Sequence, residues 1–192
     1  MGLFSQFRQT ISLSRSHDIA RRYMVVNGFD GALTTLGLLI GFYVNNVSDL
    51  SICITAGLGA AIALGMSGFS SAYISEAAER KLEFEKLQDA MVTDIGGSAH
   101  EKASRWAPVL IALINGLSPL LISLLIISPL WLAQFGYPLP LSALECAISI
   151  AFVLIFLLGV FLSSVSGDSW LISGIKTLAI AMLTSLMIYL VT

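Results

Sequence analysis

The stretch from Tyr23 to Tyr43, YMVVNGFDGALTTLGLLIGFY, decides how the rest of the chain is interpreted. It is long and apolar enough to cross a bilayer as a helix, yet it contains a carboxylate, Asp30. Four of its residues recur at intervals of 4, 3 and 4 and share one helix face: Asp30, Thr34, Gly37 and Gly41. An ionisable side chain inside a membrane helix costs at least ~2.5 kcal/mol, and it marks a functional site by default. Because glycines also let another helix approach closely, we interpret this face as the wall of a cation path.

Two other roles for Asp30 stay open at this point. Its carboxylate could accept a hydrogen bond from a Ser or Thr on another helix and serve only packing. It could also cap a helix that begins at Gly31.

The composition is that of a membrane protein. Of the 192 residues, 56% are hydrophobic and 11% are charged, and the mean hydropathy is +0.87, well above a typical soluble domain. A net charge of −2 and the lack of a basic patch argue against a nucleic-acid partner. We expect an integral protein of the lipid bilayer, in the cell membrane or, in a eukaryote, an organelle membrane.

Five apolar spans predict an all-α membrane protein with five transmembrane helices: residues 24–45, 50–75, 106–131, 142–164 and 170–191. The expected segments are an interfacial amphipathic helix or basic tail (1–22), helices 1 and 2 (23–75), a cytoplasmic acidic helical segment (76–105), and helices 3 to 5 (106–192). The second span is expected to run on past Tyr73 as one long helix, because no Pro or Gly follows before Gly96. Pro119 is expected to kink or break the third span.

The basic residues predict the orientation. They gather before the first span and between the second and third, whereas the loops at 45–49 and 132–141 have none. The positive-inside rule therefore places the N-terminus in the cytoplasm and the C-terminus outside. An odd number of spans cannot divide into two equal halves, so a path lined with two-fold symmetry requires a second copy of the chain, and we expect a homodimer.

Two further sets of residues could bind metal. Glu76, Glu79 and Glu83 stack on one helix face and could share a divalent cation, with His100 adding a nitrogen ligand. The alternative is a solvated face with ion pairs to neighbouring Arg and Lys. Met66, in the second span, offers a soft thioether that suits a borderline transition metal, although a lone Met is also ordinary packing material.

No enzyme motif appears in the sequence: it has no nucleophile elbow, P-loop, zinc-protease helix or dinucleotide fingerprint. We therefore expect no enzymatic activity and no permanently bound cofactor.

Several motifs resemble those of the vacuolar iron transporter family. The first-span run NGFDGALTTLGLL (27–39) resembles that family's signature, and the end of the second span, ALGMSGFSSAYISEAAER (63–80), is similar to its counterpart. Residues 116–120 and 173–180 resemble its third- and fifth-span patterns. The chain looks like a short member, because its cytoplasmic insert is reduced to about thirty residues. Where many members have Gly-Glu-Tyr, it reads Ser71-Ala-Tyr73.

The resemblance implies a dimeric exporter that moves Fe(II), or a similar ion such as Mn(II), Co(II) or Zn(II), out of the cytoplasm in exchange for protons. It implies that Asp30 and Met66 line the path and that Glu76, Glu79 and Glu83 collect metal. Two rival functions stay open: a metal-sensing or metal-storing membrane protein without flux, and a structural membrane bundle.

Overall fold

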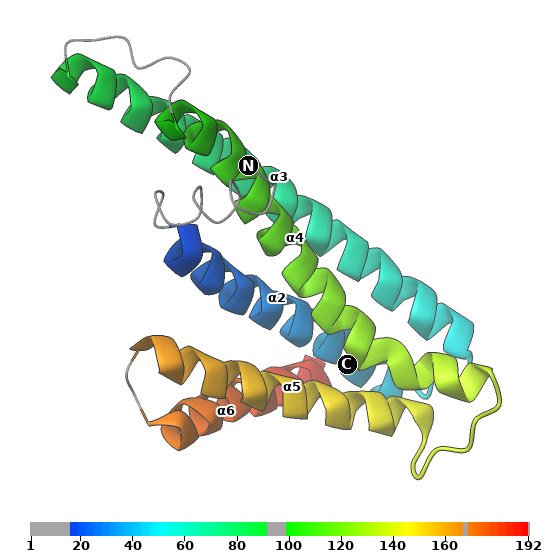
Figure 1. The fold of residues 1–192 in the computed structure, drawn as a ribbon. Helices are drawn as coiled ribbons and strands as arrows, with labels where there is room; N and C mark the ends of the chain where they lie inside the picture. The colour runs from blue at the N-terminus through cyan, green and yellow to red at the C-terminus, as the bar shows by residue number, and fades with distance from the viewer. Residues whose placement is uncertain (1–15, 92–98, 167–168, 192) are drawn as a thin grey trace. The chain divides into compact units, whose positions relative to one another are not determined.

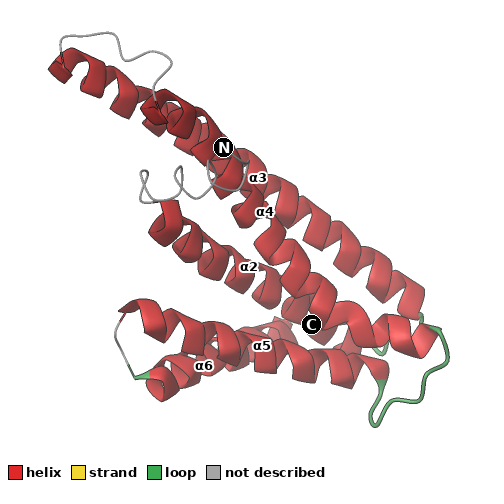
Figure 2. Cartoon of the chain, viewed as in Figure 1, coloured by secondary structure: helices red, strands yellow, loops and turns green. Residues whose placement is uncertain are grey.

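A computed structural model describes residues 16–91, 99–166 and 169–191. These residues form five helices (Figure 1): α2 (Ser16–Val44), α3 (Leu50–Met91), α4 (Ala99–Gln134), α5 (Ala143–Ser166) and α6 (Trp170–Val191). Each contains a segment long and apolar enough to cross a membrane. Helices and short loops account for all of these residues, with no strand among them (Figure 2). The expected all-α fold with five such helices is confirmed, whereas its orientation and its dimeric state stay predictions.

The second and third spans are each one continuous helix, α3 and α4. α3 has 42 residues, so it extends about 60 Å at 1.5 Å per residue, twice the ~30 Å hydrocarbon core. The expectation that it continues past Tyr73 as one helix is confirmed. Pro119, expected to kink or break the third span, does not break it, because α4 continues through this fully buried proline. A kink at this position stays a prediction.

The start of α2 differs from the predicted boundary. Residues 1–15 of the expected interfacial helix lie outside the described residues. Ser16–Arg22, expected to belong to that segment, are the first turns of α2 itself.

The chain forms two compact units, and three of the helices pass from one to the other. The first unit comprises Met1–Met24 and Met66–Leu117, and the second unit comprises Val25–Gly65 and Ser118–Thr192. Each is described below on its own.

The core of the second unit is built on a close contact between α2 and α4. A Cβ at Gly31 would lie 2.7 Å from the Pro119 Cα, so only glycine allows this approach. Thr35 Oγ1 donates a hydrogen bond to Ser123 Oγ (2.9 Å), which donates in turn to the Gly31 carbonyl (3.3 Å). Around this contact, buried apolar side chains from all five helices form the core: Ala32, Leu36, Leu39, Cys53, Ile54, Ile126, Ile127, Leu130, Ala147, Ala151, Ile155 and Ala181.

Within the second unit, α5 and α6 pack as an antiparallel pair (Figure 1). A Cβ at Gly159 would clash with Thr177 Oγ1, so glycine allows α6 to approach here. The Thr177 hydroxyl lies 3.1 Å from the Ile155 carbonyl on α5 and 2.9 Å from the Gly174 carbonyl on its own helix. Small residues and hydroxyl groups thus hold this pair together, as is usual between membrane helices.

Candidate cation pathway

One face of α2 packs against α4, and the face that carries Asp30 does not. Asp30 and Thr34 are exposed in the single chain, whereas Gly31 and Thr35 are buried. The Asp30 carboxylate has no hydrogen bond or ion pair with the part of the chain that the structure describes. Since α2 runs unbroken from Ser16 to Val44, Asp30 does not cap a helix that begins at Gly31. The carboxylate therefore stands on an uncovered face of an apolar helix.

The two glycines on the Asp30 face have different surroundings. A Cβ at Gly37 would lie 3.1 Å from the Ile188 Cδ1 methyl, so α6 of the same chain covers the face at this level. A Cβ at Gly41 would meet nothing within 4 Å. Of the two glycines predicted to allow helix packing, Gly37 therefore packs against α6 of the same chain, whereas Gly41 contacts no other helix of the described chain.

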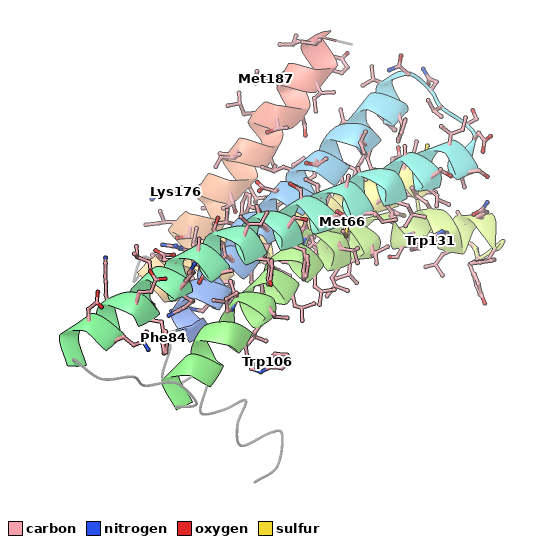
Figure 3. All side chains as sticks on the ribbon, turned by 90° about the horizontal axis from the view of Figure 1, so that it is seen from above. Met66, Phe84, Trp106, Trp131, Lys176 and Met187 are labelled. Atoms are coloured by element: carbon pink, nitrogen blue, oxygen red, sulfur yellow. The ribbon has the colours of Figure 1, made fainter. Side chains whose placement is uncertain are left out.

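Met66 lies part-way along α3, in the first unit (Figure 3). Its side chain is 59% exposed, so it is not core packing material within its own chain. The opposite face of α3 is the packed one, where Asn115 Nδ2 donates to the Gly68 carbonyl at 2.6 Å. The thioether is thus available to an ion, a second chain or lipid.

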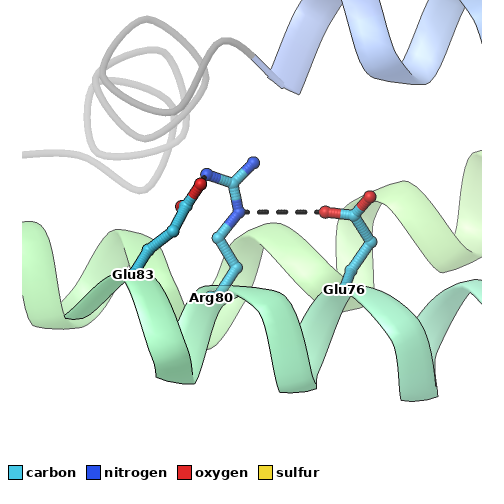
Figure 4. Close-up of polar contacts among 3 residues, drawn as sticks. All are labelled: Glu76, Arg80 and Glu83. Atoms are coloured by element: carbon cyan, nitrogen blue, oxygen red, sulfur yellow. Dashed lines mark hydrogen bonds and ion pairs between the residues drawn. The ribbon is translucent and has the colours of Figure 1, made fainter. Parts of the chain in front are cut away.

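Glu76 is the unexpected member of the acidic segment, because it is buried, with 3% exposure. It follows Gly68 and Ala72 at intervals of four, so it continues the buried small-residue stripe of α3. A buried charge needs a partner, and Arg80 supplies it, with Nε 3.8 Å from Glu76 Oε2. Arg80 Nη1 also lies 3.0 Å from Glu83 Oε2 (Figure 4). One guanidinium is thus shared by a buried and an exposed carboxylate.

The structure thus places the three stacked glutamates differently. Glu76 is buried, Glu79 is exposed, and the Glu83 side chain is 61% exposed and paired with Arg80. A second pair joins Lys81 to Glu85 at 3.9 Å. Ion pairs of this kind are what the alternative interpretation, a solvated helix face without metal, predicts for Glu83 and Glu85. A metal cation at Glu76 would have to displace the Arg80 guanidinium.

No three His, Cys, Asp or Glu side chains lie close enough to hold a metal ion in the described part of the single chain. His100 belongs to the first turn of α4, but its side chain lies outside the described residues. The metal set of Asp30, Met66, Glu76, Glu79, Glu83 and His100 therefore stays a prediction.

Arg80→Gln is expected to destabilise the protein by about 1–3 kcal/mol, because it removes the cation that acts most strongly on the buried Glu76 carboxylate and leaves only the weaker influence of Arg22. Unfolding in detergent micelles measures the effect. Adding Glu76→Gln to Arg80→Gln should recover most of the loss, since neither charge then remains. Lys81→Gln is the control: its pair with Glu85 is exposed, so its removal should change stability by less than ~0.5 kcal/mol. A loss for Arg80→Gln no larger than the control would contradict a stabilising pair.

Glu145 has a structural role that the sequence analysis missed. Its Oε2 accepts a hydrogen bond from the Ser142 backbone N–H (3.0 Å), and Ser142 Oγ accepts from the Glu145 N–H (3.3 Å). This reciprocal pair is a capping box at the start of α5, and its signal, Ser-x-x-Glu before an apolar run, is present in the sequence. Tyr43 Oη also donates to Glu145 Oε1 at 3.3 Å, which links the end of α2 to α5.

Comparisons with known proteins identify one relationship. No family model matches the chain, and no solved structure matches it. A curated protein from the archaeon Methanocaldococcus jannaschii, "Uncharacterized protein MJ0645", is 32% identical over 174 residues, which are 88% of this chain and 87% of the relative. The chain belongs to the same family as MJ0645. Since the relative's name states no activity, the resemblance to vacuolar iron transporters stays a prediction.

Proposed function

We propose that this protein is a membrane transporter that exports ferrous iron or a similar divalent transition metal from the cytoplasm, in exchange for protons. The observation that supports it most is Asp30, a carboxylate on an uncovered face of an apolar helix with no partner in the described chain. Left in lipid, this charge would cost at least ~2.5 kcal/mol, so the carboxylate must bind a proton or a cation, or contact water or a second chain.

Proton exchange follows from the chemistry of a carboxylate in a span. Either a proton or a metal cation offsets its charge, and a low-dielectric environment strongly favours that compensation. Asp30 can therefore hold one or the other in turn. The exposed carboxylates of Glu79 and Glu83 would attract cations to the basic end of the bundle, and the exposed Met66 would add a soft ligand.

The orientation and assembly are part of the same proposal. Basic residues lie near the start of α2 (Arg21 and Arg22) and in the C-terminal part of α3 (Arg80, Lys81 and Lys86). They favour a cytoplasmic location for the N-terminal end of α2 and the C-terminal end of α3. A homodimer would let a second copy contribute to the path, as the resemblance to vacuolar iron transporters implies.

Transport into proteoliposomes tests the proposal, with Fe(II), Mn(II), Co(II), Zn(II) and Mg(II) at two pH gradients. We expect flux of at least one transition metal that rises when protons are available for exchange. Absence of flux for every metal, in vesicles with folded protein, would reject a transporter.

Thermal unfolding in detergent separates the rival functions. A metal that binds only the folded state stabilises it by about 2.7 kcal/mol at a hundred times its dissociation constant. We therefore expect a transported metal to raise the unfolding temperature and Mg(II) to have a smaller effect. Stabilisation without flux would favour a sensor or store, and no stabilisation by any metal would favour a structural bundle.

A further inference from the structure

The second unit contains an open pocket that none of the expected site residues line. It has a volume of about 820 Å³ and lies between the end of α2, the loop that follows it, the start of α5 and the end of α6. Its polar lining consists of hydroxyl and amide groups: Tyr43, Asn46, Ser48, Ser142, Ser185 and Tyr189. Apolar side chains such as Ile40 and Leu186 complete it.

The pocket lies beside the Asp30 face of α2, one turn beyond Gly37. Its lining on α2 consists of Ile40, Tyr43 and Val44, whereas Gly41, which continues the Asp30 face, does not line it. Gly37 follows Asp30 by seven residues, two helical turns along the same face. At Gly37 the face meets Ile188 of α6. The pocket begins next, with Ile40 on α2 and with Ser185 and Tyr189 on either side of Ile188 in α6. Asp30, Thr34, the Gly37–Ile188 contact and the pocket thus follow one another along a single helix, all within the second unit.

We propose that the groove between α2 and α6 is the exit of the Asp30 path, that Ile188 closes it over Gly37, and that the pocket beyond receives the hydrated divalent cation. This inference rests on the proposed function. A hydrophobic constriction can gate an ion path by excluding water, and Ile188 against a bare glycine forms such a constriction. Six waters at ~30 Å³ each occupy about 180 Å³, so the pocket has room for a hydrated ion.

The oxygen atoms that line the pocket would bind a divalent cation weakly, which suits the release of an ion better than its capture. Divalent cations bind oxygen ligands, and tight sites use several carboxylates. Here the lining side-chain oxygens are neutral. Two carboxylates next to lining residues already accept hydrogen bonds: Glu145 from the Ser142 N–H and the Tyr43 hydroxyl, and Asp49 from the Ser51 N–H. The hydrogen bond from Tyr43 to Glu145 leaves the Tyr43 oxygen free to contact a cation. Weak binding is what an exit requires, because a conducted ion must leave.

Thiol labelling tests whether the pocket contains water, without any need for transport. In a Cys53→Ala/Cys146→Ser background, Ser185→Cys is compared with Leu183→Cys and Met187→Cys, exposed neighbours on α6 that do not line the pocket. These two positions bracket Ser185 in depth. We expect a membrane-impermeant thiol reagent to modify Ser185→Cys about tenfold faster than both. A rate no higher than that of the faster control would overturn the proposed exit.

Two helical glycines with different surroundings test the gate. Gly37→Ala introduces a methyl group 3.1 Å from Ile188 Cδ1, whereas Gly59→Ala, on α3 and away from the Asp30 face, meets nothing within 4 Å. We expect Gly37→Ala to lower flux about fivefold and Gly59→Ala to leave it within about twofold. Adding Ile188→Ala to Gly37→Ala should restore flux, because it removes the obstructing side chain. Equal flux in the two glycine variants would overturn the gate, whereas a wild type without flux would overturn the proposed function itself.

Discussion

Asp30→Asn is expected to lower metal flux at least about tenfold, which corresponds to ~1.4 kcal/mol in the transport barrier. Asparagine is nearly isosteric but can neither exchange a proton nor neutralise a divalent cation. The same substitution should not lower the unfolding temperature, because it removes a charge from an apolar helix at a gain of up to ~2.5 kcal/mol. Flux in proteoliposomes and unfolding in detergent, measured on one preparation, give both values.

The opposed signs separate function from packing. If Asp30 served only to hold helices together, Asp30→Asn would reduce stability and leave the flux of the folded fraction unchanged. Asp89→Asn is the matched control, since Asp89 is exposed on the polar part of α3, and it should alter neither quantity. Equal flux for Asp30→Asn and Asp89→Asn would remove Asp30 from the mechanism.

Gly31→Ala is expected to produce the largest loss of stability, about 1–3 kcal/mol or more, by overpacking a closed contact. The added Cβ would lie 2.7 Å from both Cα and the carbonyl oxygen of Pro119. Backbone atoms cannot rotate away as a side-chain end can, so α2 and α4 would have to separate. That movement would also break the hydrogen bond from Ser123 Oγ to the Gly31 carbonyl. The loss is measured as the shift in unfolding temperature and in the yield of folded protein.

Gly59→Ala serves as the comparison for that substitution. Gly59 is also a helical glycine in a span, but a Cβ there would meet nothing within 4 Å. Helix propensity alone should make this variant slightly more stable, by about 0.5–1 kcal/mol. If Gly31→Ala changed stability no more than Gly59→Ala does, the inference that α2 and α4 are in close contact at Gly31 would be contradicted.

The sequence by itself determined the class of fold and the approximate position of every apolar span, although not where α2 begins. In lipid, the backbone of a spanning segment must satisfy its own hydrogen bonds, so a long apolar run has little choice but to be a helix. The absence of Pro and Gly after residue 68 up to Gly96 likewise determined that α3 extends far past its apolar part. It also showed that Asp30 lies within a span, because that statement depends only on its neighbours in sequence.

Which face of each helix is covered was decided only by the tertiary structure. α2 carries glycines on two faces, Gly28 and Gly31 on one and Gly37 and Gly41 on the other, and the sequence does not rank them. In the structure, Pro119 and Ser123 of α4 pack against the face with Gly28 and Gly31, and Ile188 of α6 covers part of the face with Gly37 and Gly41. Glu76 and Arg80 illustrate the same limit, since a charged stretch that reads as a solvated helix contains one buried carboxylate. Between membrane helices the hydrophobic effect gives little direction, so close packing and hydrogen bonds between distant residues decide the contacts.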